Sequence, residues 1–181
     1  MKQYSYTSEG IILRRLNYGE ADRILTVFSR VYGKLTVLAK GVRKLTSKKR
    51  GHLEIFSWVK FSTKEARGFD LLTEVEILDN FDKIRKNLNK VTLAYYFCEV
   101  VNKITREGEK QATVYDLLFT ALKQLESSKN LKILRKDFVT NLLVDLGYWP
   151  QGKKMVDVDI ELESVLERKI NSVRIGKKVL E

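Results

Sequence analysis

Residues 23–39, RILTVFSRVYGKLTVLA, decide the fold of the first half of the chain. Beyond Gly33, apolar residues recur at every second position, which places them on one face of a β-strand: Leu35, Val37 and Ala39. Residues 23–29 have the composition of a second strand, and the short connection between the two contains Gly, as is typical of a β-hairpin. The stretch therefore predicts two antiparallel strands joined by a tight turn.

The same period of two extends on both sides of this hairpin, up to about residue 79. Residues 6–18 are expected to form the strand before it. Two strands are expected after it, and their inward faces are predicted to carry Leu53, Ile55, Val59 and Phe61 in the first, and Phe69, Leu71, Thr73, Val75 and Ile77 in the second. Pro is absent from this region, so any of the strands can lie inside a sheet. Five strands fit an antiparallel OB-fold barrel, and an SH3-like barrel fits the same pattern.

After residue 80 the apolar period becomes helical. Three apolar stripes follow, formed by Leu93, Phe97, Val100, Val101 and Ile104, by Val114, Leu118, Ala121, Leu122 and Leu125, and by Leu131, Leu134, Phe138, Leu142 and Leu146. The third is expected to stop at Gly147, which is followed by the only proline, Pro150. A fourth helix is expected after a capping Asp159, with Leu162, Val165, Leu166 and Ile170 facing inward. We predict an OB-fold domain over residues 1–79 and an all-α domain over residues 80–181.

The composition points to a polyanionic partner. The formal net charge is +11 and the sequence pI is about 9.6, which favours nucleic acid first and an anionic membrane second. No apolar run approaches the roughly 20 residues of a spanning helix, and the first residues carry no apolar signal-peptide core. A cytoplasmic protein is therefore expected. Cys98 is the only cysteine, which excludes an intramolecular disulfide and a cysteine zinc cluster.

A run of basic residues lies between the third and fourth predicted strands. Residues 40–52, KGVRKLTSKKRGH, contain no acidic residue, and as a strand-to-strand loop they are expected to be exposed. Cations on such a loop neutralise phosphates and displace counterions; a solvated loop that only maintains solubility is the alternative. The predicted DNA contacts are Lys40, Arg43, Lys44, Lys48, Lys49, Arg50 and His52, together with Arg14, Arg15 and Lys34 on the strands. Of the neighbours Arg14 and Arg15, at most one can point at the core.

Aromatic side chains near this region offer stacking surfaces for bases, or else pack in the core: Tyr18, Tyr32 and Trp58.

Catalysis is not supported by the sequence. The single histidine, His52, has no cysteine near it in sequence, and no Gly-rich phosphate loop occurs. The acidic residues of VDVDIELE (residues 156–163) fit helix capping better than a calcium loop. We therefore expect a protein that is not an enzyme and has no cofactor.

Several segments, taken in order, resemble the RecO family of recombination-mediator proteins. The most specific is GEADRIL (residues 19–25) followed by YGKL (32–35) and the basic AKGVRK (39–44). FSWVKF (56–61), LLTEVEILDNF (71–81) and FVTNLLVDLGYWP (138–150) follow in the order expected of that family. The resemblance covers roughly residues 4–150.

The resemblance implies an OB-fold domain joined to a helical domain, and a non-enzymatic role in DNA repair and recombination. Members of the family bind single- and double-stranded DNA, anneal complementary strands, and engage RecR and the acidic C-terminal tail of single-stranded-DNA-binding protein. They thereby help to load the RecA recombinase at gaps, which implies a cytoplasmic, nucleoid-associated protein. Two alternatives stay open: an adaptor with little DNA affinity of its own, and an RNA-binding barrel protein.

The chain departs from the family pattern in two places. Many relatives carry a four-cysteine zinc motif after the LGY element, whereas here residues 151–163, QGKKMVDVDIELE, contain no cysteine, so no zinc is expected. Asn141 stands where the family often has an arginine, which alters the site implied for the acidic tail. A substitute anion site is predicted on the polar side of the same helix, at Lys132, Arg135 and Lys136.

Overall fold

The computed structural model describes residues 5–44 and 53–166, which belong to two compact units. The first, here called the barrel domain, comprises residues 1–80 and 105–112; the second, the helical domain, comprises residues 81–104 and 113–181. The chain therefore leaves the barrel domain, forms two helices, and returns to it briefly before the remaining helices. Within the described ranges no helix is both long enough and apolar enough to cross a membrane.

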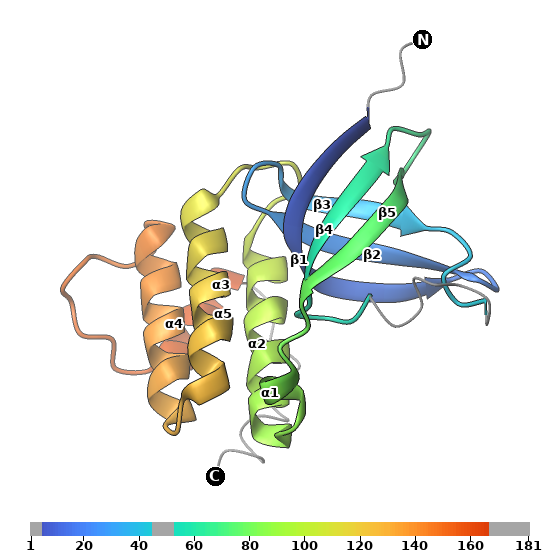
Figure 1. The fold of residues 1–181 in the computed structure, drawn as a ribbon. Coiled ribbons are helices and arrows are strands. Elements are labelled where there is room, and N and C mark those ends of the chain that lie inside the picture. Colours follow the sequence, from blue (N-terminus) through green and yellow to red (C-terminus); the bar gives the residue numbers. More distant parts are fainter. Residues whose placement is uncertain (1–4, 45–52, 167–181) are drawn as a thin grey trace. The chain divides into compact units, whose positions relative to one another are not determined.

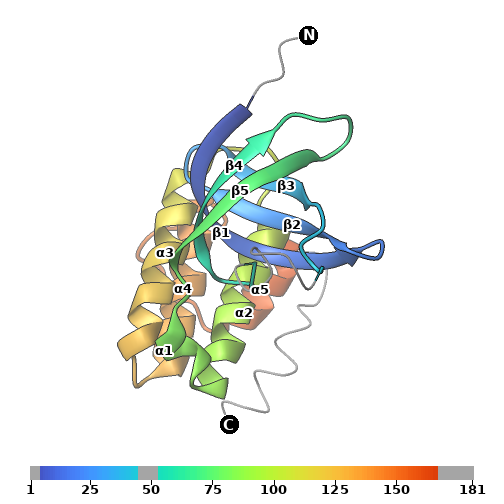
Figure 2. The same ribbon diagram turned by 45° about the vertical axis from the view of Figure 1, so that its right-hand side comes forward.

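Five strands close into the barrel (Figures 1 and 2): β1 (Ser5–Tyr18), β2 (Asp22–Ser29), β3 (Gly33–Ala39), β4 (Trp58–Lys64) and β5 (Asp70–Asp79). Their order is β1-β2-β3-β5-β4, and β1 pairs with β4 to complete the circle. Every pairing is antiparallel except that of β3 with β5, which is parallel. This is the five-stranded Greek-key barrel of the OB-fold, so the predicted fold is confirmed.

The barrel core follows the period of two in the sequence. Inward-facing positions on neighbouring strands are almost fully buried, among them Leu25, Val27, Val37, Ala39, Val59 and Phe61. The predicted inward face of β3 is confirmed, with Leu35 partly buried against the same cluster. These side chains fill the interior of the barrel, because one face of each strand points toward it.

The prediction for the fourth strand is wrong at its start. The strand begins at Trp58, and residues 53–57 form a connection with a turn at Ile55 and Phe56, although Leu53 is buried in the core. Phe56 is fully buried with a φ of 58°, in the left-handed region, and its N–H donates to the Ile12 carbonyl at 2.8 Å. Leu53 therefore reaches the core from the connection before β4 rather than from a strand, and Ile55, which was also predicted to face inward, is only half-buried.

The predicted inward face of the fifth strand is also wrong in its first half. Ser62 pairs with Glu74 and Thr63 pairs with Leu72, which leaves Thr73 as the extra residue of a β-bulge. Leu72 consequently points inward with 7% exposure, whereas Thr73 is exposed and Phe69 is 40% exposed. A bulge shifts the alternation by one position, and the sequence pattern carries no sign of it.

A short segment between two helices completes the barrel domain. Within residues 105–112, Glu107 forms a parallel bridge with Lys34, and the Gly108 N–H donates to the Lys34 carbonyl at 2.9 Å. Gly33 has a φ of 70°, and a Cβ built there would lie 2.0 Å from the Glu109 carbonyl oxygen. The close approach of the two backbones therefore requires glycine at this position.

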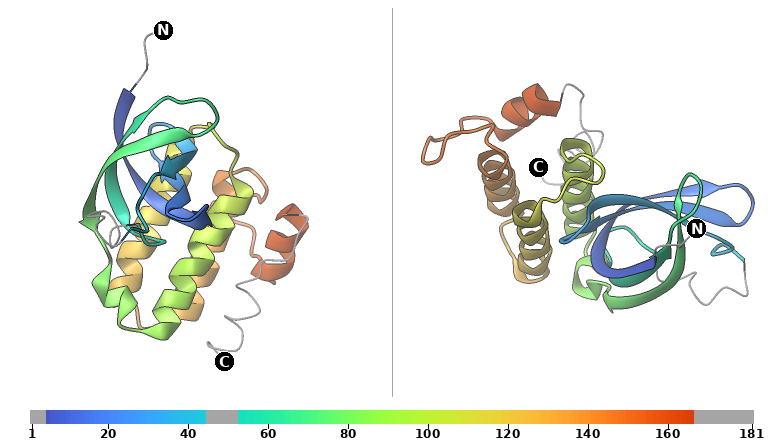
Figure 3. Two further views of the ribbon diagram at one scale, coloured as in Figure 1. Left: turned by 90° about the vertical axis from the view of Figure 1, so that its right-hand side faces the viewer. Right: turned by 90° about the horizontal axis from the view of Figure 1, so that it is seen from above.

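The helical domain contains α1 (Asp82–Arg85), α2 (Leu88–Ile104), α3 (Ala112–Ser127), α4 (Leu131–Asp145) and α5 (Val158–Leu166). Figure 3 (right) shows α2, α3 and α4 nearly end-on, beside one another. The three predicted stripes form the packed faces, except that Ile104, Leu131 and Leu146 at their ends are only half-buried. The ring centroids of Phe97 on α2 and Phe138 on α4 lie 4.2 Å apart. Gly147 ends α4 with a φ of 76°, as predicted. The four-residue α1 had no sequence signal.

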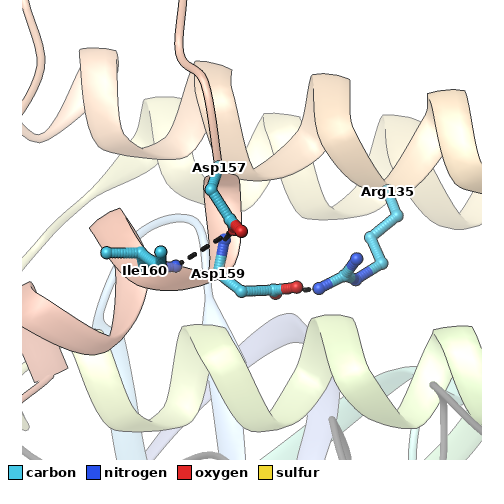
Figure 4. Close-up of polar contacts among 4 residues, drawn as sticks. All are labelled: Arg135, Asp157, Asp159 and Ile160. Carbon is cyan, nitrogen blue, oxygen red and sulfur yellow. Dashed lines mark hydrogen bonds and ion pairs between the residues drawn. The ribbon is translucent and has the colours of Figure 1, made fainter.

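The predicted capping residue of the fourth helix is wrong. Helix α5 begins at Val158, and the Asp157 carboxylate accepts hydrogen bonds from the Asp159 N–H at 2.8 Å and the Ile160 N–H at 3.3 Å (Figure 4). Asp157 is therefore the capping residue, and Asp159 lies inside the helix. Leu162 is buried as predicted, Val165 and Leu166 are half-buried, and Ile170 lies outside the described residues.

Candidate nucleic-acid interface

At one end of the barrel, the chain leaving β3 is fastened to the β1–β2 turn. The Gly41 N–H donates to the Asp22 carboxylate at 2.7 Å, and the Arg43 N–H donates to the Ala21 carbonyl at 2.9 Å. The Arg43 guanidinium also donates to the Gly19 carbonyl at 3.0 Å. These bonds hold the first part of the basic segment, residues 40–44, next to the β1–β2 turn.

The outer surface of β1, β2 and β3 carries a row of aliphatic side chains. Leu16 pairs with Ile24, and Ile24 pairs with Leu38, so the three share one face across three strands. Leu71 of β5 lies beside Leu38 and extends the row. Leu16 is 42% exposed, and the other three are half-buried. We call these four residues the aliphatic row.

Polar and charged side chains border the aliphatic row on the same face. Arg14 pairs with Thr26, which pairs with Thr36, so an exposed guanidinium and two hydroxyls form the next row. On the other side, Tyr18 is 51% exposed and lies opposite Asp22. Aliphatic and aromatic surface of this kind contacts bases, and a guanidinium binds phosphate. The face formed by Arg14, Tyr18 and the aliphatic row is called the β1–β2–β3 face below.

A different part of the barrel exterior, on β1, β4 and β5, is acidic. Lys60 pairs in register with Glu9 on one side and Glu76 on the other, and Glu74 pairs with the neighbouring Ser62. A shallow hollow in this surface is lined by Thr7, Lys60, Phe61, Ser62, Glu74, Val75 and Glu76. Three carboxylates around one ammonium repel a phosphate backbone, so the β1–β2–β3 face suits nucleic acid better.

The basic residues predicted as DNA contacts divide by exposure. Arg14, Lys40 and Lys44 are exposed. Arg15 is half-buried in an ion pair with Glu54, and Arg43 is half-buried against the β1–β2 turn. Of the adjacent arginines, it is thus Arg14 that faces solvent.

Lys34 is also half-buried, and its ammonium donates to the Thr105 carbonyl. Burial lowers the pKa of Lys34 from its usual value, while the nearby Glu107 carboxylate acts in the opposite direction. The Lys34 ammonium is therefore held by a hydrogen bond within the barrel domain. The remaining candidates lie outside the described residues: Lys48, Lys49, Arg50 and His52.

The three aromatic candidates also divide. Tyr32 packs against Tyr6, with ring centroids 4.5 Å apart, and Trp58 is half-buried, whereas Tyr18 is the exposed one. Sequence reasoning missed the aliphatic row. The signal was present, because Ile24-Leu25 and Val37-Leu38 are apolar pairs that place one side chain on each face of a strand.

In the helical domain, the predicted anion site is partly occupied by the protein itself. Arg135 forms an ion pair with Asp159 (Figure 4), and its guanidinium lies 4.9 Å from the Tyr96 ring centroid. Burial raises the pKa of Tyr96 to about 12, and the Arg135 charge opposes part of that rise. Lys132 and Lys136 are exposed on α4. Across the described ranges, no three potential metal-ligating side chains gather into a site.

The fold and this surface define the chain as an OB-fold protein with an appended helical domain. Two family models match it: the N-terminal model of recombination protein O over residues 1–81 and the C-terminal model over residues 85–160. The chain belongs to the RecO family.

Curated relatives agree with this assignment. The chain is 32% identical to the DNA repair protein RecO of Roseiflexus sp. (strain RS-1), over 83% of this chain and 53% of the relative. It is 30% identical to the same protein of Dehalococcoides mccartyi, over 91% of this chain and 65% of the relative. It is 33% identical to that of Pelotomaculum thermopropionicum, over 80% of this chain and 56% of the relative. The chain thus spans between about half and two thirds of the length of these relatives. Their shared name describes DNA repair and no catalytic activity.

Proposed function

We propose that this chain is a non-catalytic repair mediator that binds single- and double-stranded DNA, anneals complementary strands, and helps to load RecA on gaps coated with single-stranded-DNA-binding protein. The observation that carries the proposal is the β1–β2–β3 face, where Arg14 and Tyr18 border the aliphatic row. Oligonucleotides bind OB-folds on the face around strands 2 and 3 and on the adjoining loops. Location at the nucleoid follows from this binding.

The proposed mechanism is electrostatic. Two DNA strands repel each other through their phosphates, and cations that neutralise both backbones lower that repulsion. Arg14, Lys40 and Lys44 supply exposed charge at the barrel, while the aliphatic row contacts unpaired bases. Pairing then needs no bond-making step and no nucleotide. Phosphate contacts carry no sequence information, so binding is expected to depend little on sequence.

The other predicted contacts keep their place in the proposal. Arg15, Lys34 and Arg43 contribute charge from half-buried positions in the barrel domain. Lys48, Lys49, Arg50 and His52 are proposed contacts from sequence alone, since they lie outside the described residues.

The proposed protein partners are RecR and the acidic C-terminal tail of single-stranded-DNA-binding protein. For the tail, Lys132 and Lys136 offer exposed ammonium groups on α4. Arg135 is already paired with Asp159, so a carboxylate of the tail has to replace Asp159 to reach it. The two lysines are therefore the first contacts expected for an acidic peptide, and Arg135 a second.

The test is the annealing of complementary oligonucleotides that are coated with single-stranded-DNA-binding protein. The chain is expected to accelerate annealing when the coat protein is intact, and less so when the coat protein lacks its last residues. Acceleration that does not depend on those residues would remove the tail from the mechanism and leave annealing in place. The absence of acceleration with either coat protein would reject the mediator function.

A further inference from the structure

We propose that the loop joining α4 to α5 is a second binding site for single-stranded DNA, distinct in its residues from the β1–β2–β3 face. The site comprises residues 146–154, LGYWPQGKK, here called the aromatic loop, in the α4–α5 connection drawn in Figure 1. The inference rests on the proposed function, because it takes DNA as the ligand. It adds a site in the helical domain, which the barrel mechanism does not use.

Hydrogen bonds fix the shape of the aromatic loop. The N–H groups of Tyr148 and Trp149 both donate to the Leu143 carbonyl, at 2.8 and 3.1 Å. The indole N–H of Trp149 donates to the Lys153 carbonyl at 2.9 Å, which closes the far side of the loop. A loop held in this way loses little conformational freedom when it binds a ligand.

The fixed backbone presents an aromatic ring to solvent. Tyr148 is 55% exposed, although a tyrosine usually places its ring against other apolar groups. Trp149 differs, because it is half-buried and has the Lys153 ammonium 5.1 Å from its ring centroid. The Tyr148 ring is therefore available to stack on an unpaired base, a contact that every base type can make.

Positive charge accompanies the ring. Lys153 and Lys154 are both exposed, and no acidic residue occurs between Asp145 and Asp157. An exposed aromatic ring and two exposed cations on one loop are the combination that binds single-stranded nucleic acid, with the ring on a base and the ammonium groups on phosphates. Bases in a duplex are already stacked, so the aromatic loop is expected to prefer single strands.

A chain with two such sites can hold two strands. One strand lies on the β1–β2–β3 face and the other on the aromatic loop, so both strands of a future duplex are bound to the same molecule. The second strand then binds at the raised effective concentration that linkage provides.

A bridging assay tests the second site in the full chain. A thymidine oligonucleotide is fixed to beads, and the protein is asked to capture a second, labelled thymidine oligonucleotide that cannot pair with it. Tyr148→Ser with K153A and K154A is expected to reduce the captured label by at least about tenfold, because roughly one stacked base and two phosphate contacts are lost. The protein should still bind the beads. Tyr148→Phe combined with K153A and K154A should recover the part of the capture that is due to stacking, since stacking does not need the hydroxyl.

The matched control is K83A/K86A, which removes two exposed charges from a different part of the helical domain and should leave capture unchanged. Photocrosslinking of a 5-iodouracil oligonucleotide, read by mass spectrometry, should give an adduct on the peptide that contains Tyr148. Unchanged capture by the triple variant, or adducts confined to barrel peptides, would overturn the second site and leave DNA binding by the barrel intact. Failure of the unaltered chain to bind the beads would instead overturn the proposed function itself.

Discussion

At the scale of single residues, Gly33 carries two constraints that can be separated by experiment. Its φ of 70° is unfavourable for any residue with a Cβ, and a Cβ would also meet the Glu109 backbone. Gly33→Ala is therefore expected to lower the free energy of unfolding by about 3 kcal/mol, the sum of about 1 kcal/mol for the backbone and about 2 for overpacking. Urea denaturation at constant m-value measures the loss.

The matched control for that substitution is Gly19→Ala. Gly19 has a similar φ of 54°, but a Cβ there meets no atom within 4 Å. The control should cost only the backbone contribution, about 1 kcal/mol. Equal losses in the two variants would mean that the Glu109 backbone does not pack closely against Gly33.

At the scale of elements, the sequence predicts the period of a segment better than its boundaries. The barrel strands and the three long helices follow directly from apolar residues at every second, third or fourth position. The errors lie where one residue changes the geometry without changing the pattern. Thr73 is polar and fits either face of a strand, so nothing marks it as the extra residue of the bulge. Phe56 reaches the core from a left-handed turn, a conformation that a large aromatic residue seldom adopts.

Helix α5 provides the prediction at this scale, because two aspartates two positions apart could each have capped it. Asp157 is the cap and Asp159 pairs with Arg135. Asp157→Ala is expected to destabilise α5 by about 1 kcal/mol, whereas Asp157→Asn should cost only a few tenths, since asparagine caps helices as well as aspartate does. Hydrogen exchange of the amides in residues 158–166 measures this locally. Equal destabilisation by both substitutions would indicate that the charge of Asp157, rather than its capping bonds, stabilises the helix.

At the scale of the whole molecule, charge and fold class could be predicted, but the surface that carries the charge could not. A net charge of +11 indicates a polyanionic partner without giving its position. The exposed members of the predicted set, Arg14, Lys40 and Lys44, become recognisable only when strand register and burial are known. The aliphatic row is harder still to predict. The apolar pairs Ile24-Leu25 and Val37-Leu38 show that one member of each pair faces outward, but only burial shows which member it is.

The position of DNA on the barrel domain can be tested through the salt dependence of binding. Each phosphate contact on a single strand contributes about 0.7 to the slope of log affinity against log salt concentration, so R14A/K40A should flatten the slope by about 1.4. K60A is the control on the acidic side, where Lys60 lies between Glu9 and Glu76 and is expected to contact no phosphate. Titration of a fluorescent oligonucleotide at several salt concentrations gives both slopes. If K60A flattened the slope as much per charge as R14A/K40A, the net charge of the molecule would be steering DNA without a defined face. A difference between them would place the strand on β1, β2 and β3, because uniform attraction cannot distinguish one surface cation from another.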